Sequence, residues 1–145
     1  MGTTPPTEAG TAAGSGAPRR RLHILIADDE RDTVLTLMML LREEGHEVQG
    51  VHDGAAALRA AGRSAFDAII IDIEMPGLDG YAVARALRAR HSAAPAPLLI
   101  AISGKWTRPS EKFLALAVGF EHHLTKPCDP NALLELLKPL ALPPG

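Results

Sequence analysis

Leu22-His23-Ile24-Leu25-Ile26-Ala27-Asp28-Asp29 is the stretch that decides the fold, because a short apolar run here ends in two carboxylates. Two later runs end in a similar way: Ala68-Ile69-Ile70-Ile71 leads to Asp72, and His122-His123-Leu124-Thr125 leads to Lys126-Pro127. Short runs rich in leucine and β-branched residues are typical of buried strands in a parallel sheet. Open α/β sheets bind their ligands outside the carboxyl ends of such strands. The three runs therefore predict that three carboxylates and one ammonium group meet at one edge of a sheet, as a site for a cation and a phosphate.

Helical patterns alternate with these runs along the chain. The sequence predicts strands at 22–27, 47–51, 68–72, 98–102 and 122–125, and helices at 31–44, 54–61, 80–91, 110–118 and from Pro130 onward. Asp53, Asp79 and Asp129 are expected to cap three of the helices, and Gly45 to end the first. Five βα units without a break predict an α/β fold, a doubly wound five-stranded parallel sheet with helices on both faces.

The helical periodicity also predicts which residues face the core. The first helix is expected to bury Val34, Met38 and Leu41, and the last to bury Leu133, Leu136, Leu137 and Leu140.

Composition sets the domain limits and argues against some functions. Residues 1–20 have almost no large apolar side chain and are expected to form a disordered tail or linker before a domain at 21–142. Residues 1–21 hold Glu8 and three arginines, which leaves 12 basic and 16 acidic residues in the remainder. A nucleic-acid partner is therefore not expected, because it would need a basic face. The three arginines either touch an anionic partner or, as we favour, form a solvated run.

Cysteine content and hydropathy bear on location. Cys128 is the only cysteine of the 145 residues, so an intramolecular disulfide is impossible and a reducing compartment is expected. No apolar run approaches the ~20 residues that span a bilayer, and the N-terminus lacks the apolar segment of a secretory signal. We expect a cytoplasmic protein without a membrane partner.

The acidic residues at the strand ends predict the chemistry of the site. Two unit charges about 5 Å apart repel by roughly 3 kcal/mol at an effective dielectric constant of 20, so the carboxylates need a neutralising group. Hard oxygen ligands suit Mg²⁺, with Mn²⁺ as a possible substitute. An Asp28-Asp29 pair by itself also fits a helix cap, but Asp72 and Lys126 at neighbouring strand ends favour the cation site.

Four motifs in this order resemble the receiver domain of two-component response regulators, including the single-domain chemotaxis regulator. They are Ile26-Ala27-Asp28-Asp29-Glu30, Asp72-Ile73-Glu74-Met75-Pro76-Gly77-Leu78-Asp79-Gly80, Ala101-Ile102-Ser103-Gly104 and Leu124-Thr125-Lys126-Pro127. The resemblance covers about residues 22–140 and implies a flavodoxin-like strand order 2-1-3-4-5. It fits either a free-standing regulator or the receiver part of a hybrid histidine kinase.

The resemblance also implies a role for each matched residue. Asp72 would be the phosphoacceptor, taking a phosphoryl group from a histidine kinase or phosphotransfer protein. Asp29, Asp72 and the Glu74 backbone carbonyl would bind Mg²⁺, with Asp28 acting through water. The family implies a cis Lys126-Pro127 bond that aims Lys126 inward, where its ammonium group would pair with the phosphoryl oxygens. Ser103 would hydrogen-bond to the same oxygens.

Three further positions are candidates for switching or for tuning the phosphoryl lifetime. His123 stands where the family usually has Tyr or Phe, so it is either a switch residue that titrates near neutral pH or an ordinary surface histidine. Glu74 and Lys105 follow Asp72 and Ser103 by two residues each. We hypothesise that they form an ion pair over the site, the alternative being two independent solvated side chains.

The expected function is a signalling switch that acts on a downstream protein partner, not an enzyme beyond its own phosphorylation and dephosphorylation. One alternative is a phosphatase with an aspartate nucleophile, although that chemistry usually places a second Asp two positions after the nucleophile. Another is a receiver-like module that binds partners without phosphorylation. His23, His46 and His91 are expected to have structural roles instead of donating a phosphoryl group.

Overall fold

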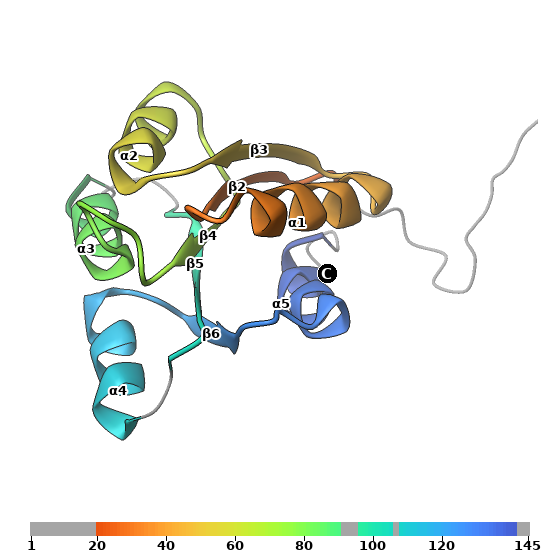
Figure 1. The fold of residues 1–145 in the computed structure, drawn as a ribbon. Coiled ribbons are helices and arrows are strands. Elements are labelled where there is room, and N and C mark those ends of the chain that lie inside the picture. The colour runs from red at the N-terminus through yellow and green to blue at the C-terminus, as the bar shows by residue number, and fades with distance from the viewer. Residues whose placement is uncertain (1–19, 91–95, 106–107, 142–145) are drawn as a thin grey trace, which may run out of the picture.

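The computed structural model describes residues 20–90, 96–105 and 108–141, and a parallel β-sheet runs through the middle of this part (Figure 1). Its strands are β2 (His23–Ala27), β3 (Glu47–Val51), β4 (Ala68–Asp72), β5 (Leu98–Ser103) and β6 (His122–Thr125). They lie in the order β3-β2-β4-β5-β6, and all neighbours pair in parallel. In chain order this is 2-1-3-4-5, so the predicted doubly wound α/β sheet is confirmed.

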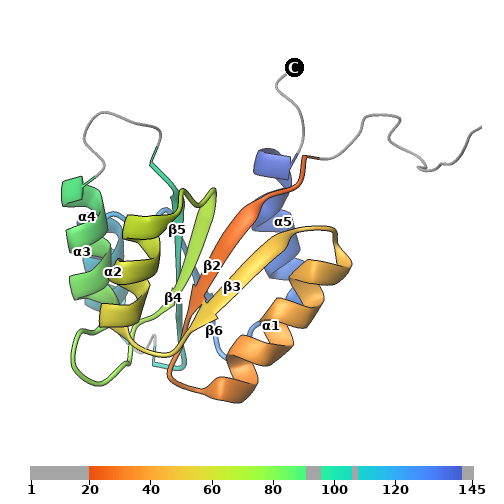
Figure 2. The ribbon, with the colours of Figure 1, turned by 90° about the horizontal axis from the view of Figure 1, so that it is seen from above.

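Helices cover both faces of the sheet. Those in the described residues are α1 (Arg31–Glu43), α2 (Gly54–Arg63), α3 (Gly80–Arg90), α4 (Pro109–Val118) and α5 (Pro130–Ala141). Figure 2 shows α1 and α5 on one face and α2, α3 and α4 on the other.

The central strands are apolar because both of their faces are buried. Ile69 and Ile71 of β4 pack with residues of α2, α3 and α4, whereas Ile70 packs with α1 and α5. Burying one such side chain contributes about 1.5–3 kcal/mol, so the strand register is strongly fixed. The register in turn fixes where the residues that follow each strand must lie.

Side-chain caps mark the helix starts that the sequence predicts. Asp53 Oδ1 accepts the Ala56 N–H at 2.7 Å, and Asp79 Oδ1 accepts the Ala82 N–H at 2.9 Å. Before α5, Asp129 Oδ1 accepts the Asn131 N–H at 3.0 Å. All three predicted caps are therefore confirmed.

The helix faces differ in detail from the prediction. Leu37 of α1 is buried, whereas Met38 is only partly buried at the rim of the cluster, and Leu136 and Leu140 of α5 are likewise partly buried. Met38 still packs against the sheet, because a Cβ on Gly50 of β3 would lie 2.7 Å from Met38 Sδ. Helix boundaries agree to within two residues.

Arg20 is the first described residue and contacts the domain. Its N–H donates to the Ala141 carbonyl at 2.5 Å, and its guanidinium pairs with Asp67 at 3.0 Å. The predictions for residues 1–19 and for His91 lie outside the described residues.

Candidate functional site

The acidic residues predicted from the strand ends do meet at one edge of the sheet. One carboxylate oxygen from each of Asp28, Asp29 and Asp72 lies within 4.8 Å of the other two. Ala27 pairs with Ile71 in the sheet, so the residues after β2 necessarily come next to the end of β4. Asp28 and Asp72 are buried, at 0% and 1% exposed, whereas Asp29 is exposed. We refer to this edge, with Ser103 and Lys126, as the carboxyl edge.

Asp28 is held in place but incompletely satisfied. Its Oδ1 accepts the Glu30 N–H at 2.9 Å. Its Oδ2 lies 3.0 Å from Lys126 Nζ, yet this buried oxygen has no hydrogen bond of acceptable geometry within the described residues. An acidic oxygen that is buried and lacks a hydrogen bond is costly, so this site favours a further positive group.

Asp72 lies at the centre of the site. Its Oδ1 accepts the Glu74 N–H at 3.2 Å, and its Oδ2 accepts from Lys126 Nζ at 3.2 Å. Burial raises the pKa of Asp72 to about 7, and the charge of Asp28 adds to this, although Lys126 and the Glu74 N–H act in the opposite direction. Without a cation, Asp72 therefore resists ionisation at neutral pH.

Lys126 is the positive group that faces these acids. Its Nζ lies 2.7 Å from Glu30 Oε1, 3.0 Å from Asp28 Oδ2 and 3.2 Å from Asp72 Oδ2. Burial by itself lowers the pKa of Lys126, but hydrogen bonds and charges from these carboxylates raise it above its usual value. The Lys126-Pro127 bond is cis, as the family resemblance implies.

Glu30 is a contact of the site that sequence reasoning missed. It lies within the Asp28-Asp29-Glu30 motif, but nothing in the sequence indicated a partner for its side chain. Lys126 is 96 residues away along the chain, so only the fold reveals the pair. The contact with Lys126 lowers the pKa of Glu30, so Glu30 is ionised and adds negative charge to the carboxyl edge.

The Ser103 hydroxyl hydrogen-bonds to both of the residues that were hypothesised to pair with each other, Glu74 and Lys105. Its Oγ donates to Glu74 Oε2 at 2.6 Å and accepts the Lys105 N–H at 2.9 Å. Among the described residues, Glu74 and Lys105 form no ion pair. The Glu74 carboxylate instead accepts a hydrogen bond from the Ser103 hydroxyl. The structure therefore replaces that pair with a Ser103–Glu74 hydrogen bond.

His123 lies on β6 opposite Ala101 of β5, with its side chain exposed. Partial burial lowers its pKa, and the charges of Lys112 and His122 lower it further. His123 is therefore neutral over a wider pH range than a free histidine. Its predicted role as a switch stays a prediction, and Trp106 beside Lys105 lies outside the described residues.

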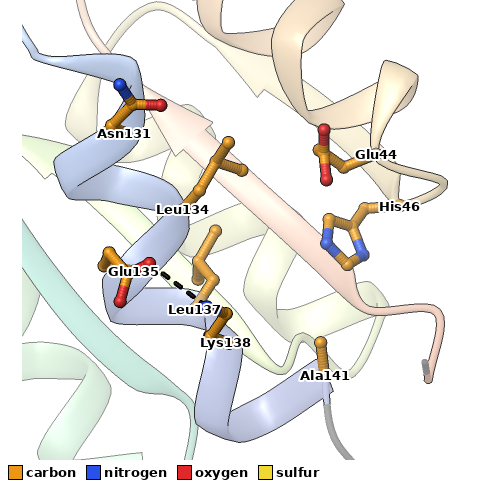
Figure 3. A pocket seen from close by; sticks show the side chains of 8 residues that line it. All are labelled: Glu44, His46, Asn131, Leu134, Glu135, Leu137, Lys138 and Ala141. Carbon is orange, nitrogen blue, oxygen red and sulfur yellow. Dashed lines mark hydrogen bonds and ion pairs between the residues drawn. The ribbon is translucent and has the colours of Figure 1, made fainter. Parts of the chain in front are cut away.

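The remaining described histidines with resolved contacts have structural partners. His46 Nδ1 accepts the Leu22 N–H at 3.1 Å, and His23 Nδ1 lies 2.9 Å from the Ala65 carbonyl. His46 also borders a pocket of about 250 Å³ between the end of α1 and α5 (Figure 3). None of the three clustered aspartates lines this pocket, so it is separate from the carboxyl edge.

The carboxyl edge fits a divalent cation. Oxygens of three aspartates lie within 4.8 Å of one another there, and one buried oxygen of Asp28 lacks a hydrogen bond within the described residues. The donors are all oxygen, which suits Mg²⁺ rather than a softer metal.

Comparisons with known proteins agree with this site. A profile described as "Response regulator receiver domain" matches residues 24–138. The transcriptional regulatory protein PrrA of Mycobacterium tuberculosis is 39% identical over 104 residues, covering 72% of this chain and 43% of that protein. The sensor protein GacS of Pseudomonas syringae pv. syringae is 33% identical over 135 residues, covering 90% of this chain but 14% of that protein.

The fold also matches a solved structure closely. The chemotaxis protein CheY4 of Vibrio cholerae aligns with a TM-score of 0.75 and 29% identity, covering 82% of this chain and 98% of that one. This chain spans less than half the length of the curated relatives PrrA, TcrA and RegX3, at 43%, 46% and 48% of those proteins. Within residues 20–90, 96–105 and 108–141, no helix has both the length and the apolarity that a membrane crossing requires. With the profile matching most of the chain, and with the acids and lysine gathered at the carboxyl edge, this protein belongs to the response regulator receiver domain family.

Proposed function

We propose that the protein is a phosphoacceptor: Asp72 takes a phosphoryl group from a histidine kinase or phosphotransfer protein in a Mg²⁺-dependent reaction. The observation that carries this proposal is the buried Asp72 carboxylate, which lies beside Asp28 and Asp29 and 3.2 Å from Lys126. A carboxylate with a raised pKa at the edge of a sheet is more typical of a chemical site than of a structural one. The cytoplasmic location expected from the sequence belongs to the same proposal.

The chemistry requires little beyond position and charge. An Asp72 oxygen attacks phosphorus, the P–N bond of the donor phosphohistidine breaks, and the imidazole leaves with the electron pair of that bond. Mg²⁺ held by Asp29, Asp72 and the Glu74 carbonyl, with Asp28 through water, would supply positive charge to the phosphoryl oxygens. Lys126 would share its N–H groups with the same oxygens, as a compact point charge. No separate general base is needed, because the attacking oxygen carries no proton once Asp72 is ionised.

Two surfaces suit the partners that this proposal requires. A groove of about 460 Å³ between α1 and the residues after β6 borders Lys126 and leaves room for a donor to approach. On α4, Phe113 and Leu116 are 73% and 66% exposed, an unusual fraction for large apolar side chains. We propose that a downstream protein binds there.

Labelling with a small phosphodonor tests the proposal. Incubation with Mg²⁺ and acetyl phosphate or phosphoramidate is expected to add one phosphoryl group, which intact-mass spectrometry detects. Asp72→Asn is expected to abolish the label. Asp67→Asn, which changes an aspartate at the opposite edge of the sheet, is the matched control and is expected to keep it.

The outcomes separate the three function classes. Repeated turnover with continuing phosphate release would favour a phosphatase with an aspartate nucleophile. Absence of any label, with the protein folded and Mg²⁺ present, would favour a module that binds partners without phosphorylation. Label that persists in Asp72→Asn would overturn Asp72 as the acceptor.

A further inference from the structure

The Ser103 hydroxyl is fully engaged before any phosphoryl group is present. It donates to Glu74 Oε2 at 2.6 Å and accepts the Lys105 N–H at 2.9 Å, while Ser103 itself is 1% exposed. A hydrogen bond of this length to a carboxylate belongs to the stronger, charge-assisted class. Water has little access to the serine, so its partners are those that the protein supplies.

A serine hydroxyl has one proton and therefore donates to one acceptor at a time. Lys126 differs in this respect, because its ammonium group has three N–H donors and already contacts Glu30, Asp28 and Asp72 together. A phosphoryl group on Asp72 can take over the Lys126 N–H that faces Asp72 Oδ2, while Glu30 keeps its own contact with Lys126. The phosphoryl group can accept a hydrogen bond from the Ser103 hydroxyl only if that hydroxyl no longer donates to Glu74.

We propose that Glu74 is a positioning residue that holds Ser103 in the unphosphorylated arrangement, and that the phosphoryl group must compete with the Glu74 carboxylate for the Ser103 hydroxyl. This inference rests on the proposed function, since it concerns the same site. The O–H group turns from one acceptor to the other, and no proton is transferred.

Charge makes the exchange responsive to phosphorylation. A phosphoryl group adds about −1.5 to −2 units of charge at neutral pH. Glu74 is tied to Asp72 through its own N–H, which lies 3.2 Å from Asp72 Oδ1, so the two acidic side chains belong to one short loop. The new charge therefore repels the carboxylate that holds Ser103, and the same event supplies a replacement acceptor.

The exchange also affects the end of β5. Lys105 N–H donates to Ser103 Oγ, so this main-chain group is bonded to the same hydroxyl that changes its acceptor. The chain between Ser103 and α4 is short, with α4 beginning at Pro109. Glu74 thereby affects the hydrogen bonds at the end of β5, the strand that precedes α4 in the chain.

Binding of beryllofluoride, an analogue of the phosphoryl group, tests the proposal in the full chain with Mg²⁺. We expect Glu74→Ala to tighten beryllofluoride binding by about tenfold, because a hydrogen bond to a charged group no longer has to be broken. Glu74→Gln keeps an acceptor oxygen and is expected to fall between Glu74→Ala and the wild type. Glu43→Gln removes a carboxylate at the far end of α1 and is expected to leave binding unchanged.

The same substitution in a Ser103→Ala background separates the hydrogen bond from the general effect of charge. There the effect of Glu74→Ala is expected to shrink to less than about threefold, because only the lost repulsion remains. Equal effects of Glu74→Ala in both backgrounds would overturn the proposal. Circular dichroism of each variant verifies that it is folded.

The metal-free protein gives a second readout. Glu74→Ala is expected to shift the Lys105 amide resonance, because the serine that accepts this N–H is no longer fixed; an unchanged resonance would contradict the inference. If wild-type protein fails to bind beryllofluoride at all, the proposed function fails. If it binds with dependence on Asp72 but the two backgrounds agree, only the role of Glu74 fails.

Discussion

The two edges of the sheet treat their acidic residues in opposite ways. At the amino edge, which we define by the residues Leu22, Asp67 and Glu121 just before the strands, each acid has enough donors. Asp67 accepts from Arg20 at 3.0 Å and from the His23 N–H at 2.8 Å. Glu121 Oε1 accepts from Arg88 at 2.6 Å and from the Leu99 N–H at 2.9 Å. These acids complete the strand ends and leave nothing for a ligand to supply.

The carboxyl edge is built from the same residue types but with too few donors. Asp28 and Asp72 are buried together, one Asp28 oxygen has no hydrogen bond, and the pKa of Asp72 is raised to about 7. Lys126 is the one basic side chain that pairs with these acids among the described residues. The acids at the amino edge are paired with donors and stabilise the strand ends. The acids at the carboxyl edge carry excess negative charge, which favours binding of a cation.

Of all changes at the two edges, removing Lys126 should lower the free energy of unfolding most. Lys126→Met leaves two buried carboxylates without a cation, which we expect to lower the free energy of unfolding by about 3 kcal/mol at pH 8 without Mg²⁺. Urea unfolding measures the loss. At pH 5, where Asp72 is protonated, the loss should be much smaller, and an equal loss at both pH values would contradict the electrostatic explanation.

Magnesium should reverse part of the imbalance. At pH 8 and a concentration about 100 times its dissociation constant, Mg²⁺ is expected to raise the free energy of unfolding by about 2.7 kcal/mol. At pH 5 the gain should fall, because a proton on Asp72 competes with the cation. Thermal unfolding with and without Mg²⁺ measures both values. Asp29→Asn should lose most of the gain, whereas Asp67→Asn should keep it.

Asp72 itself should destabilise the metal-free fold. Its pKa is raised from 3.8 to about 7, so the folded state prefers the protonated form. Stability from this group is present below about pH 4 and is lost as the pH rises through about 7. Asp72→Asn is therefore expected to raise the free energy of unfolding by about 2 kcal/mol at pH 8 without Mg²⁺, and to do little at pH 4. A destabilised variant at pH 8 would show that Asp72 is satisfied without a cation.

Changes at the amino edge should be the smallest and should not depend on Mg²⁺. Asp67→Asn keeps the size of the side chain but weakens the bonds to Arg20 and the His23 N–H. We expect a loss of about 1 kcal/mol in urea unfolding, equal with and without the cation. A loss that varies with Mg²⁺ would mean that the two edges are coupled.

Much of the site could be predicted because it depends on strand ends. Asp28, Asp72 and Lys126 each follow a run that is recognisable as a buried strand, and parallel strands must bring their carboxyl ends together. The caps Asp53, Asp79 and Asp129 were predictable for a similar reason, since each bonds within three residues of itself. Helix faces were predicted less well, because periodicity alone does not fix how far each helix turns toward the core, and Leu37 is buried where Met38 was expected.

By itself, the sequence pattern determined the alternation of strands and helices and the edge where the acids meet, while the family resemblance implied the strand order and the role expected of each matched residue. Only the tertiary structure decided which partners Glu30 and Glu74 have at the carboxyl edge. Glu30 pairs with Lys126 across 96 residues, and Glu74 binds Ser103 across 29 residues instead of pairing with Lys105. Local pattern sets which residues reach the carboxyl edge, but the choice of partner depends on the distances between side chains that come from different strands and loops. Those distances are fixed by packing of the whole core and have no signature in the chain.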